Sequence, residues 1–474
     1  MKSARTDSFE LPEGFLDGFT QLAEEQKRDL IEALDSLGPT SIRLNPHKST
    51  TEIFSEDMVP WCEEGRYLQS RPVFTTDPLH HSGAYYVQEA GSMFIEQLYL
   101  QGACALSKPK HILDLCASPG GKTTLLASLA GEEALVVANE VTRQRVNSLV
   151  DNVRRWGTGN IAVTSADPSR FAPLQEFFDL ILVDAPCSGE GMFRKDHKAR
   201  TEWSRESVIN CAQRQRRILS DIWGSLAVGG TLIYSTCTFN EQENEENVRW
   251  MCETFDCQGV EINIDPQWNI WHRKVCGINT FRFLPHLTRS EGFFAAILRK
   301  GSNKGVAQPT ITQPRNPKNK GRRPTEHKNP FSSVAAAQRT ILERWITEPS
   351  KMRFCNITDS CYAIPSSHMQ ALELLSSSLA VIYSGVTMGR FFRDEFKPEH
   401  ALALYSKVNR EACPQHELSL EEALEYLRKH DLNAERFEQG INLLQYKGLP
   451  LGWIKKSGNK TTNMLPKELR IMTL

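Results

Sequence analysis

Short apolar runs alternate with longer amphipathic stretches between residues 106 and 300. The runs are HILDLCA from His111, ALVVANE from Ala134, IAVTSAD from Ile161, FDLILVDAP from Phe178 and GGTLIYSTCT from Gly229. Leu125 to Ala130, Arg143 to Trp156 and Val208 to Leu226 fit crossover helices. Repeated strand–helix–strand units predict an α/β fold with a parallel sheet and helices on both faces. FRFLP from Phe281 and GFFAAILRK from Gly292 have little chain between them, so we expect them to pair antiparallel at the sheet edge.

Three further regions flank this core. Residues 1–105 predict a small mixed α/β accessory domain, because a stretch with helical spacing precedes the extended segment SIRLNP. Residues 301–330 hold five prolines, seven Lys or Arg and one acid, and predict a flexible basic linker. The linker is either a plain spacer or a secondary contact for phosphates. Residues 331–474 predict a second globular region, with helices at Ser332 to Ile346 and Ser419 to His430 and short strands at the end.

Composition excludes some classes of protein. Hydrophobic residues make up 40% and charged residues 24% of the 474 residues, which is typical of a globular protein. The apolar runs fall short of the ~20 residues that span a bilayer, and the N-terminus has no signal-peptide pattern, so we expect no membrane association and a cytoplasmic location. The net charge of −1 does not by itself indicate a nucleic-acid partner.

The twelve cysteines are expected to be reduced thiols. No CxxC pair occurs, and Cys252 and Cys257 have no matching second pair, so we expect no metal site.

The stretch ILDLCASPGGKTTLL predicts a ligand-binding loop. An apolar strand ends in a Gly-rich turn that opens a helix, which places backbone N–H groups against a ligand. The stretch does not match the Walker A motif, because Cys116 stands where that motif requires its first glycine. The dinucleotide pattern G-x-G-x-x-G is also absent. The remaining candidate is a loop for S-adenosylmethionine, which has no pyrophosphate to bind.

Acidic residues follow the next three predicted strands. Glu140 ends the second strand, Asp167 the third and Asp184 the fourth. In open parallel sheets, ligands bind at the carboxyl ends of the strands. Glu140 is placed to accept the ribose hydroxyls and Asp167 to accept the adenine amino group. A single acid at a strand end is usually a helix cap, but three acids beside this loop favour a cofactor site.

Two cysteines end neighbouring strands on the same edge. Cys187 follows the fourth strand in DAPCSG, and Cys237 ends the fifth in STCT. A lone cysteine there is more often a small buried hydrophobe. A thiol beside a methyl donor suits cytosine C5 methylation, because thiolate addition at C6 makes C5 nucleophilic. Asp184 is placed to take part in protonation at N3, and the second thiol could act as acid or base in product release. The chemistry alone does not say which cysteine attacks.

Several segments resemble the Nol/Nop/Sun family of RNA cytosine-C5 methyltransferases. The central ones are ILDLCASPGGKTT, ILVDAPCSGEGMFRKD and YSTCTFNEQENEENV, and the N-terminal ones are PTSIRLNP and YYVQEAGSM. FRFLPHLTRSEGFF, GVTMGRFFRDEFKPEHALAL and KGLPLGWIKK resemble the bacterial RsmF type, which methylates 16S ribosomal RNA. The resemblance implies a Rossmann-like class I methyltransferase core, an RRM-like N-terminal α/β domain, a C-terminal PUA-like domain and a monomer.

The resemblance also implies roles for residues. Cys237 would be the nucleophile and Cys187 would assist product release, with S-adenosylmethionine as cofactor. Lys122 would also help to orient the target base, and Arg145 is a weaker candidate for the cofactor, with a solvated helix face as the alternative. The implied cofactor contacts are Cys116, Ala117, Ser118, Pro119, Gly120, Gly121, Lys122, Glu140, Asp167 and Asp184.

RNA contacts are expected from basic residues near the Pro-Cys loop. The favoured cluster is Arg194, Lys195, Lys198 and Arg200, which would line the rim of the active site. The expected partner is 16S ribosomal RNA or the small ribosomal subunit. Transfer RNA as substrate and a non-catalytic RNA-binding assembly factor are the alternatives. Both cysteines argue against the second alternative, because a binding module needs neither thiol.

Overall fold

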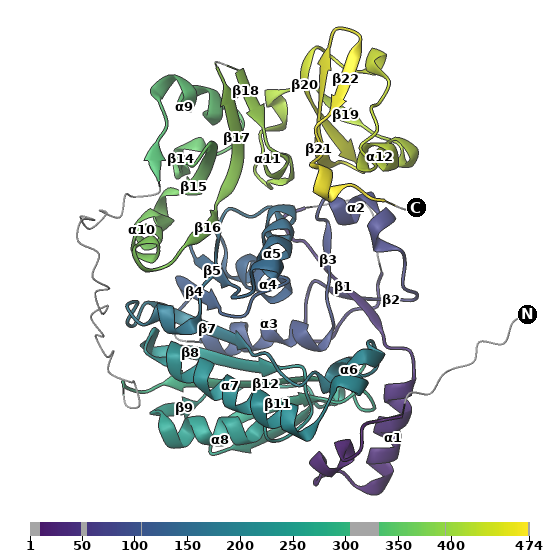
Figure 1. Cartoon of the computed structure of the whole chain (residues 1–474), viewed down its shortest axis with the longest axis vertical. Helices are drawn as coiled ribbons and strands as arrows, with labels where there is room; N and C mark the ends of the chain where they lie inside the picture. Colours follow the sequence, from purple (N-terminus) through teal and green to yellow (C-terminus); the bar gives the residue numbers. More distant parts are fainter. Residues whose placement is uncertain (1–9, 49–54, 106, 304–330, 394, 473–474) are drawn as a thin grey trace, which may run out of the picture.

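The computed structural model describes residues 10–48, 55–105, 107–303, 331–393 and 395–472. A central sheet occupies the middle of the molecule, and two smaller sheets from the C-terminal part of the chain lie above it in Figure 1. From residue 304 on, the predicted linker lies outside the described residues.

The central sheet confirms the predicted α/β core. Five strands form its parallel centre: β4, β5, β6, β7 and β8. The strands at its two sides, β10, β11, β12, β9 and β16, pair antiparallel. As predicted, β11 and β12 pair antiparallel. In spatial order the strands are β10 (Trp271–Val275), β11 (Ile278–Phe283), β12 (Phe293–Lys300), β8 (Leu226–Thr236), β7 (Phe178–Asp184), β4 (His111–Asp114), β5 (Leu135–Asn139), β6 (Ile161–Thr164) and β16 (Val381–Ser384), with β9 (Cys257–Gly259) paired to β12.

Helices between these strands cover the sheet. They are α4 (Gly121–Ala130), α5 (Arg143–Trp156), α6 (His197–Glu202), α7 (Arg205–Trp223) and α8 (Glu245–Thr254). Helix α7 begins earlier than predicted, because the Ser204 hydroxyl caps it by accepting the backbone N–H of Ser207 at 3.0 Å. Helices α7 and α8 pack side by side in the lower half of Figure 1.

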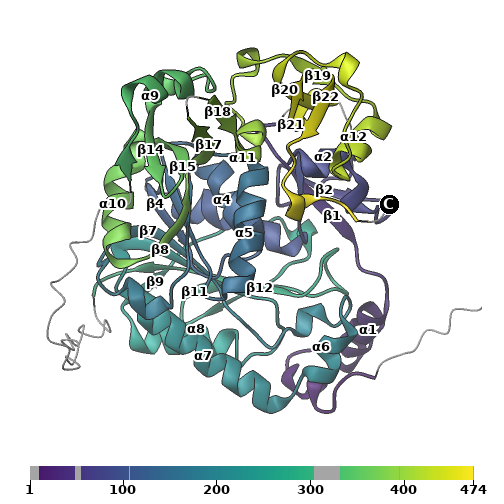
Figure 2. The same ribbon diagram turned by 45° about the horizontal axis from the view of Figure 1, so that its top comes forward.

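The N-terminal region contributes two separate parts. Helix α1 packs its buried Leu30 and Leu34 into an apolar cluster with Phe193 and Phe239 of the core. A three-stranded antiparallel sheet of order β2-β1-β3 lies beside α4 and α5 (Figure 2). The elements are α1 (Glu24–Asp35), β1 (Thr40–Leu44), β2 (Gly65–Leu68), α2 (Pro78–His81), β3 (Tyr85–Val87) and α3 (Ile95–Gln97).

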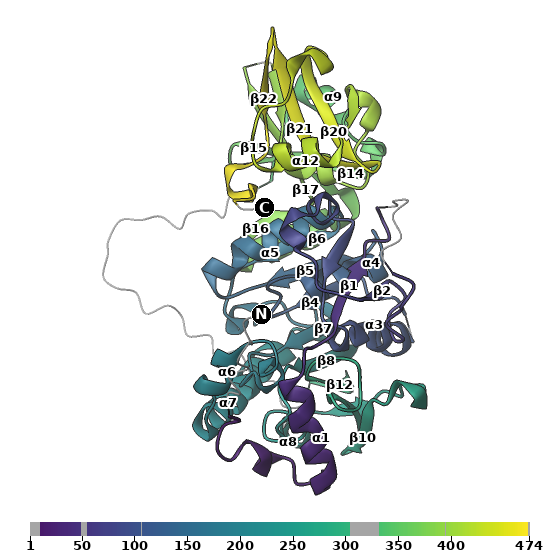
Figure 3. The same cartoon turned by 90° about the vertical axis from the view of Figure 1, so that its right-hand side faces the viewer.

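The C-terminal part forms a five-stranded and a four-stranded sheet, the latter at the top of Figure 3. The predicted helix from Ser332 begins only at Ala336, because Ser332 and Ser333 pair with β14. The five-stranded part comprises β13 (Ser332–Ser333), α9 (Ala336–Glu343), β14 (Met352–Ile357), β15 (Ser360–Pro365), α10 (Met369–Ser378), β17 (Val386–Phe392), β18 (Glu395–Pro398) and α11 (His400–Leu404). The four-stranded part comprises β19 (Gln415–Glu417), α12 (Leu420–Leu427), β20 (Gly440–Tyr446), β21 (Leu449–Ser457) and β22 (Lys460–Asn463).

Strand β16 joins the C-terminal region to the core. It lies between α10 and β17 in the chain but pairs antiparallel with β6, so it forms one edge of the central sheet. Leu372 of α10 and Tyr383 of β16 belong to the same apolar cluster as the central strands. The C-terminal region therefore shares a core with the central sheet. None of the described helices has the length and apolar character that a membrane crossing requires.

Candidate functional site

The Gly-rich loop runs from β4 into α4, as predicted. Gly120 has φ +109°, a left-handed conformation that disfavours any residue with a Cβ. A Cβ at Gly120 would also lie 3.1 Å from Cδ1 of Leu149, which is tighter than ordinary contact. A Cβ at Gly121 would lie 3.3 Å from the Tyr86 ring. The two glycines therefore let the loop turn sharply and approach the N-terminal sheet.

Asp114, the last residue of β4, lies beneath this loop. Its side chain is buried, and Oδ2 accepts a hydrogen bond of 2.6 Å from the Thr123 hydroxyl. The other oxygen, Oδ1, has no hydrogen-bond partner among the residues that the structure describes. Burial raises the pKa of Asp114 to about 7, against the lowering effect of the Thr123 bond. We did not predict this acid from the sequence, although it ends the first strand as Glu140, Asp167 and Asp184 end or follow theirs.

A cavity of about 170 Å³ lies between the loop and the N-terminal sheet. Of residues 116–122, all except Gly120 line it, together with Asp114 and Asp184. Its other wall is the segment from Tyr86 to Glu89 together with Ser92, which belongs to YYVQEAGSM. Sequence reasoning used that segment only for its resemblance to a family and did not assign it to the site.

Glu140 and Arg145 lie together behind the loop and do not line the cavity. Glu140 is buried, and Oε1 accepts the backbone N–H of Thr142 at 2.8 Å. Arg145 is 3.4 Å from Oε2 of Glu140 and donates to the carbonyl of Ser118 at 2.6 Å. Arg145 therefore ties the buried acid to the loop, although its side chain is half exposed.

Asp167 is not brought to the cavity. Its Oδ1 accepts from the backbone N–H and the hydroxyl of Ser169, at 3.1 and 2.8 Å, and so caps the short helix Pro168–Phe171. Its Oδ2 lies 3.4 Å from Arg217. The hydrogen bond from the Ser169 hydroxyl is the main reason that the pKa of Asp167 is lowered. A contact with a cofactor stays a prediction for this residue.

Lys122 and Asp184 form an ion pair at the mouth of the cavity. Nζ of Lys122 lies 2.8 Å from Oδ2 of Asp184, and the Ser235 hydroxyl donates to Oδ1 at 2.8 Å. Burial alone would lower the pKa of Lys122, but the charge and hydrogen bond of Asp184 outweigh it and the pKa is raised. The pair therefore keeps a cation and a carboxylate between the loop and the strand ends.

The two predicted cysteines meet beside this ion pair. Asp184 and Ser235 are register partners in β7 and β8, so the loops that follow them start side by side. Sγ of Cys187 lies 3.0 Å from Sγ of Cys237, and the backbone N–H of Cys237 points at the Cys187 sulfur at 3.3 Å. The hydrogen bond to Cys237 and burial both raise the pKa of Cys187 well above its usual value. Its raised pKa therefore favours the protonated form of Cys187.

The favoured basic cluster is only partly available for RNA. The side chain of Arg194 is only 5% exposed and lies 2.7 Å from Glu291, and Arg200 is buried and lies 2.9 Å from Asp35. Both arginines hold the structure together, so the prediction that they line the rim was wrong. Lys195 and Lys198 remain exposed, although Lys195 also lies 3.5 Å from Glu291. Within the described ranges, no three His, Cys, Asp or Glu side chains gather as a metal site would require.

Comparison with known proteins covers nearly the whole chain. Residues 103–299 match the family described as 16S rRNA methyltransferase RsmB/F, residues 11–90 the N-terminal domain of 16S rRNA methyltransferase RsmF, and residues 413–471 the methyltransferase RsmF PUA domain. A methyltransferase homolog protein from Pyrococcus horikoshii is similar in structure, with a TM-score of 0.50 and 29% identity over 60% of this chain and 94% of that one. NSun6 from the same organism has a TM-score of 0.50 at 21% identity, covers 62% of this chain and 98% of that one, and supports the fold.

Sequence relatives extend over all the described regions. Ribosomal RNA small subunit methyltransferase F of Erwinia tasmaniensis is 33% identical over 87% of this chain and 84% of its own length. The protein of the same name from Pectobacterium atrosepticum is 31% identical over 97% of this chain and 96% of its own. The chain therefore belongs to the ribosomal RNA small subunit methyltransferase F family, with the methyltransferase core, N-terminal domain and C-terminal PUA domain of that family.

Proposed function

We propose that this protein methylates C5 of a cytosine in 16S ribosomal RNA, with S-adenosylmethionine as methyl donor and a covalent bond between Cys237 and C6 of the base. The observation that carries the proposal is the pair of thiols 3.0 Å apart at the ends of neighbouring strands, next to the Lys122–Asp184 ion pair. The names of the sequence relatives support ribosomal RNA of the small subunit as the substrate.

The residues around the loop fit the proposed cofactor. Asp114 carries a buried oxygen that has no hydrogen-bond partner in the described part of the chain, and the loop offers a cavity at the start of a helix. The residues that line this cavity, Asp114 among them, would hold the cofactor. Glu140 does not line the cavity, so its contact with the ribose hydroxyls stays a prediction. When bound, S-adenosylmethionine supplies an electrophilic methyl group on a sulfonium centre.

The cysteines supply the covalent chemistry. The thiolate of Cys237 adds to C6, the electrons of the C5–C6 double bond move toward N3, and C5 gains nucleophilic character. Asp184, held by Lys122 and Ser235, is placed to share a proton with N3. The cation of Lys122 is placed to stabilise the Cys237 thiolate before attack and to orient the base.

Product release requires a base and a leaving group. Once Cys237 has bonded to carbon, Cys187 loses the thiolate partner that favours its protonated form, and it can give its proton to solvent. The Cys187 thiolate then takes the C5 proton, the C5–C6 double bond re-forms, and the electrons of the C6–S bond return to Cys237. This restores the resting pair of one thiol and one thiolate.

Isotope-labelled S-adenosylmethionine tests the proposal. Small ribosomal subunits, free 16S RNA and transfer RNA are incubated separately with the protein, and the RNA is digested to nucleosides. We expect the label in 5-methylcytidine from the small subunit or its RNA. Label found only in transfer RNA would contradict the substrate, and label in another nucleoside would contradict the chemistry. RNA binding without transfer to any RNA would indicate an assembly factor instead.

A further inference from the structure

Glu243 is a fully buried acid between the two cysteine loops, and the chemistry above gives it no role. It lies six residues after Cys237, in the turn that leads to α8. Its carboxylate accepts hydrogen bonds from the backbone N–H of Ser188 at 3.1 Å, from Nε2 of Gln215 at 2.6 Å and from Nδ2 of Asn240 at 2.8 Å. These three donors come from the loop after β7, from α7 and from the loop after β8.

The chain on both sides of Cys187 is held by this group. Ser188, the next residue, donates its N–H to Glu243, and Gln215 donates to the carbonyl of Pro186, the preceding residue, at 2.9 Å. Gln215 is itself buried, and its Nε2 also donates to Glu243. One carboxylate and one amide therefore fix the position of the backbone that carries the Cys187 sulfur.

Cys237 is linked to the same group less directly. Asn240 donates to Glu243 and to the Thr238 hydroxyl, at 2.8 and 2.9 Å, and the hydroxyls of Thr238 and Ser188 lie 2.9 Å apart. The carbonyl of Cys237 is held separately by the N–H of Gly191 at 2.9 Å. Cys237 also follows the paired end of β8, so it keeps supports that do not depend on Glu243.

We infer that Glu243 is the positioning residue of product release: its carboxylate holds the Cys187 loop so that the Cys187 sulfur stays beside Cys237 and within reach of the C5 proton. This role deepens the proposed function and rests on it. All three partners of Glu243 are donors, so only a carboxylate can accept from all of them, and an amide would turn its own N–H groups toward at least one donor. Glu190, another buried acid of this region, accepts instead from Trp203, Phe239 and Asn240.

The variant Glu243→Gln tests the inference with almost no change in side-chain volume. We expect the first round of methyl transfer, measured with enzyme in excess over RNA, to stay within about threefold of the native rate. Steady-state turnover should fall at least tenfold, and a denaturation-resistant RNA adduct should accumulate several-fold. Glu243→Asp keeps the charge on a shorter side chain and should restore part of the turnover. Glu246→Gln, at an exposed glutamate three residues away, is the matched control and should behave as the native protein.

A second measurement reads the geometry without RNA. Diamide oxidises two neighbouring thiols to a disulfide and is itself reduced to the hydrazine, and peptide mass mapping identifies the Cys187–Cys237 linkage. We expect this disulfide to form several-fold more slowly in Glu243→Gln than in the native protein or in Glu246→Gln. The oxidation assay still tests the positioning if the native protein transfers no methyl group, an outcome that defeats the proposed function alone.

Three results would overturn the inference. These are an unchanged rate of disulfide formation, the absence of adduct in a folded Glu243→Gln protein that turns over slowly, and equal losses in first-round transfer and in turnover. If Glu243→Gln does not fold, the same comparisons are made with Glu243→Asp, for which smaller changes in the same directions are expected.

Discussion

Among single residues, Asp114 is unusual because it is a buried acid beneath the Gly-rich loop, and one of its oxygens has no hydrogen-bond partner within the described ranges. Burial raises its pKa from 3.8 to about 7, so the folded protein holds a proton on Asp114 over a range in which the unfolded chain has lost it. The contribution of this residue to stability is therefore full below about pH 4 and is lost as the pH rises through 7. Without a ligand, the buried Asp114 therefore lowers the stability of the folded protein at neutral and higher pH, and a polar or charged ligand can offset this loss.

The variant Asp114→Asn should relieve this cost, since the amide oxygen can still accept from Thr123 and no charge is buried. We expect a higher melting temperature than that of the native protein at pH 8, by several degrees, and a much smaller gain at pH 5. Thermal unfolding without cofactor at both pH values measures it. A gain of equal size at both values would show that ionisation of Asp114 is not the cause.

In the proposed mechanism Cys237 forms the bond that Cys187 helps to break, so variants of the two cysteines should behave differently. Cys237→Ala should reduce methyl transfer by about 10³-fold or more and form no covalent RNA adduct. Cys187→Ala should form an adduct that survives denaturation and migrates more slowly in a gel. An adduct trapped by Cys237→Ala would reverse the two assignments.

The sequence could predict which site residues lie close together where their positions depend on neighbouring strands. Asp184, Cys187 and Cys237 follow β7 and β8, and the carboxyl ends of adjacent parallel strands must meet. The separate fates of Glu140 and Asp167 could not be predicted, because both follow strands on the same edge and only side-chain packing turns one toward Arg145 and the other into a helix cap. Glu243 escaped prediction because two of its three partners, Ser188 and Gln215, are 55 and 28 residues away in the chain.

Among the elements, β1 contacts helix α4 through Arg43. This buried guanidinium donates to the Thr124 hydroxyl at 2.7 Å, to the carbonyl of Gly121 at 3.1 Å and to Gln88 at 2.8 Å, and it stacks over Trp156. Burial lowers its pKa to about 10, which still leaves it charged at neutral pH. Arg43 thus connects the N-terminal sheet to the first turn of α4.

The variant Arg43→Met should weaken this connection while filling most of the space. Since several buried partners lose their donor, we expect the free energy of unfolding to fall by about 3 kcal/mol. Cofactor affinity should fall roughly tenfold, and turnover at saturating cofactor should change less. Chemical unfolding and calorimetric titration with S-adenosylhomocysteine measure the two effects. Arg66→Met on β2 is the control, because this arginine donates to the nearby carbonyls of Glu63 and Gly65. Native cofactor affinity in Arg43→Met would refute the connection.

The sequence predicts elements well where one continuous apolar run forms one strand, as in Phe178–Asp184. It fails for β16, because VIYS is short and only partly buried, and its partner β6 lies more than 200 residues earlier in the chain. Neither the periodicity nor the composition of the sequence predicts that long-range strand pairing.

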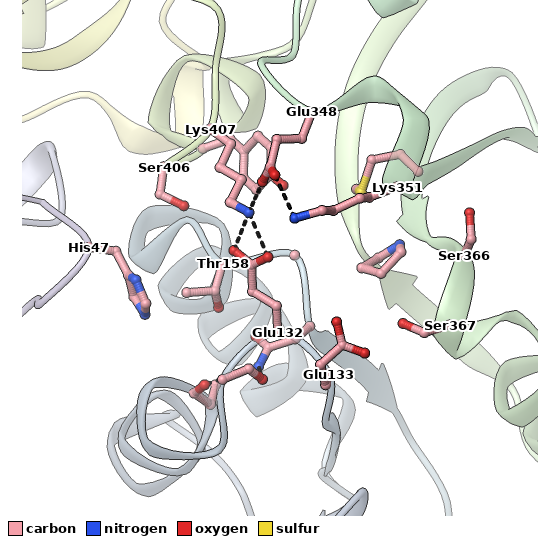
Figure 4. Close-up of a pocket in the computed structure, with 17 residues that line it drawn as sticks. His47, Glu132, Glu133, Thr158, Glu348, Lys351, Ser366, Ser367, Ser406 and Lys407 are labelled. Carbon is pink, nitrogen blue, oxygen red and sulfur yellow. Dashed lines mark hydrogen bonds and ion pairs between the residues drawn. The ribbon is translucent and has the colours of Figure 1, made fainter.

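Across the whole molecule, a cavity of about 290 Å³ lies where the core meets the C-terminal region, lined by residues of both (Figure 4). Lys407 reaches from the C-terminal region to Glu132 of the core and also contacts Glu348, which Lys351 contacts at 2.5 Å. The hydrogen bonds from Lys351 and Lys407 lower the pKa of Glu348 to about 2. This cavity is separate from the thiols, and its ion pairs fasten two parts of the chain.

Lys407→Met should loosen this junction modestly, because ion pairs near the surface contribute little individually. We expect a melting temperature about 1–3 °C lower at low salt and a smaller difference in 0.5 M NaCl, where the pairs are screened. Since the folded pKa of Glu348 is lowered, the difference should persist above pH 5 and shrink as the pH falls toward 2. Lys460→Met, on an exposed strand end, should show neither dependence. A difference insensitive to salt would point to lost packing instead.

The placement of β16 at the edge of the central sheet has a consequence for synthesis. At about 5–20 residues per second, β6 leaves the ribosome on the order of ten seconds or more before its partner strand does. During that interval the outer backbone groups of Ile161–Thr164 have no strand to bind, and an unpaired edge is a template for pairing with another nascent chain. Translation of the last third of the message thus completes the protection of a domain encoded almost entirely before it.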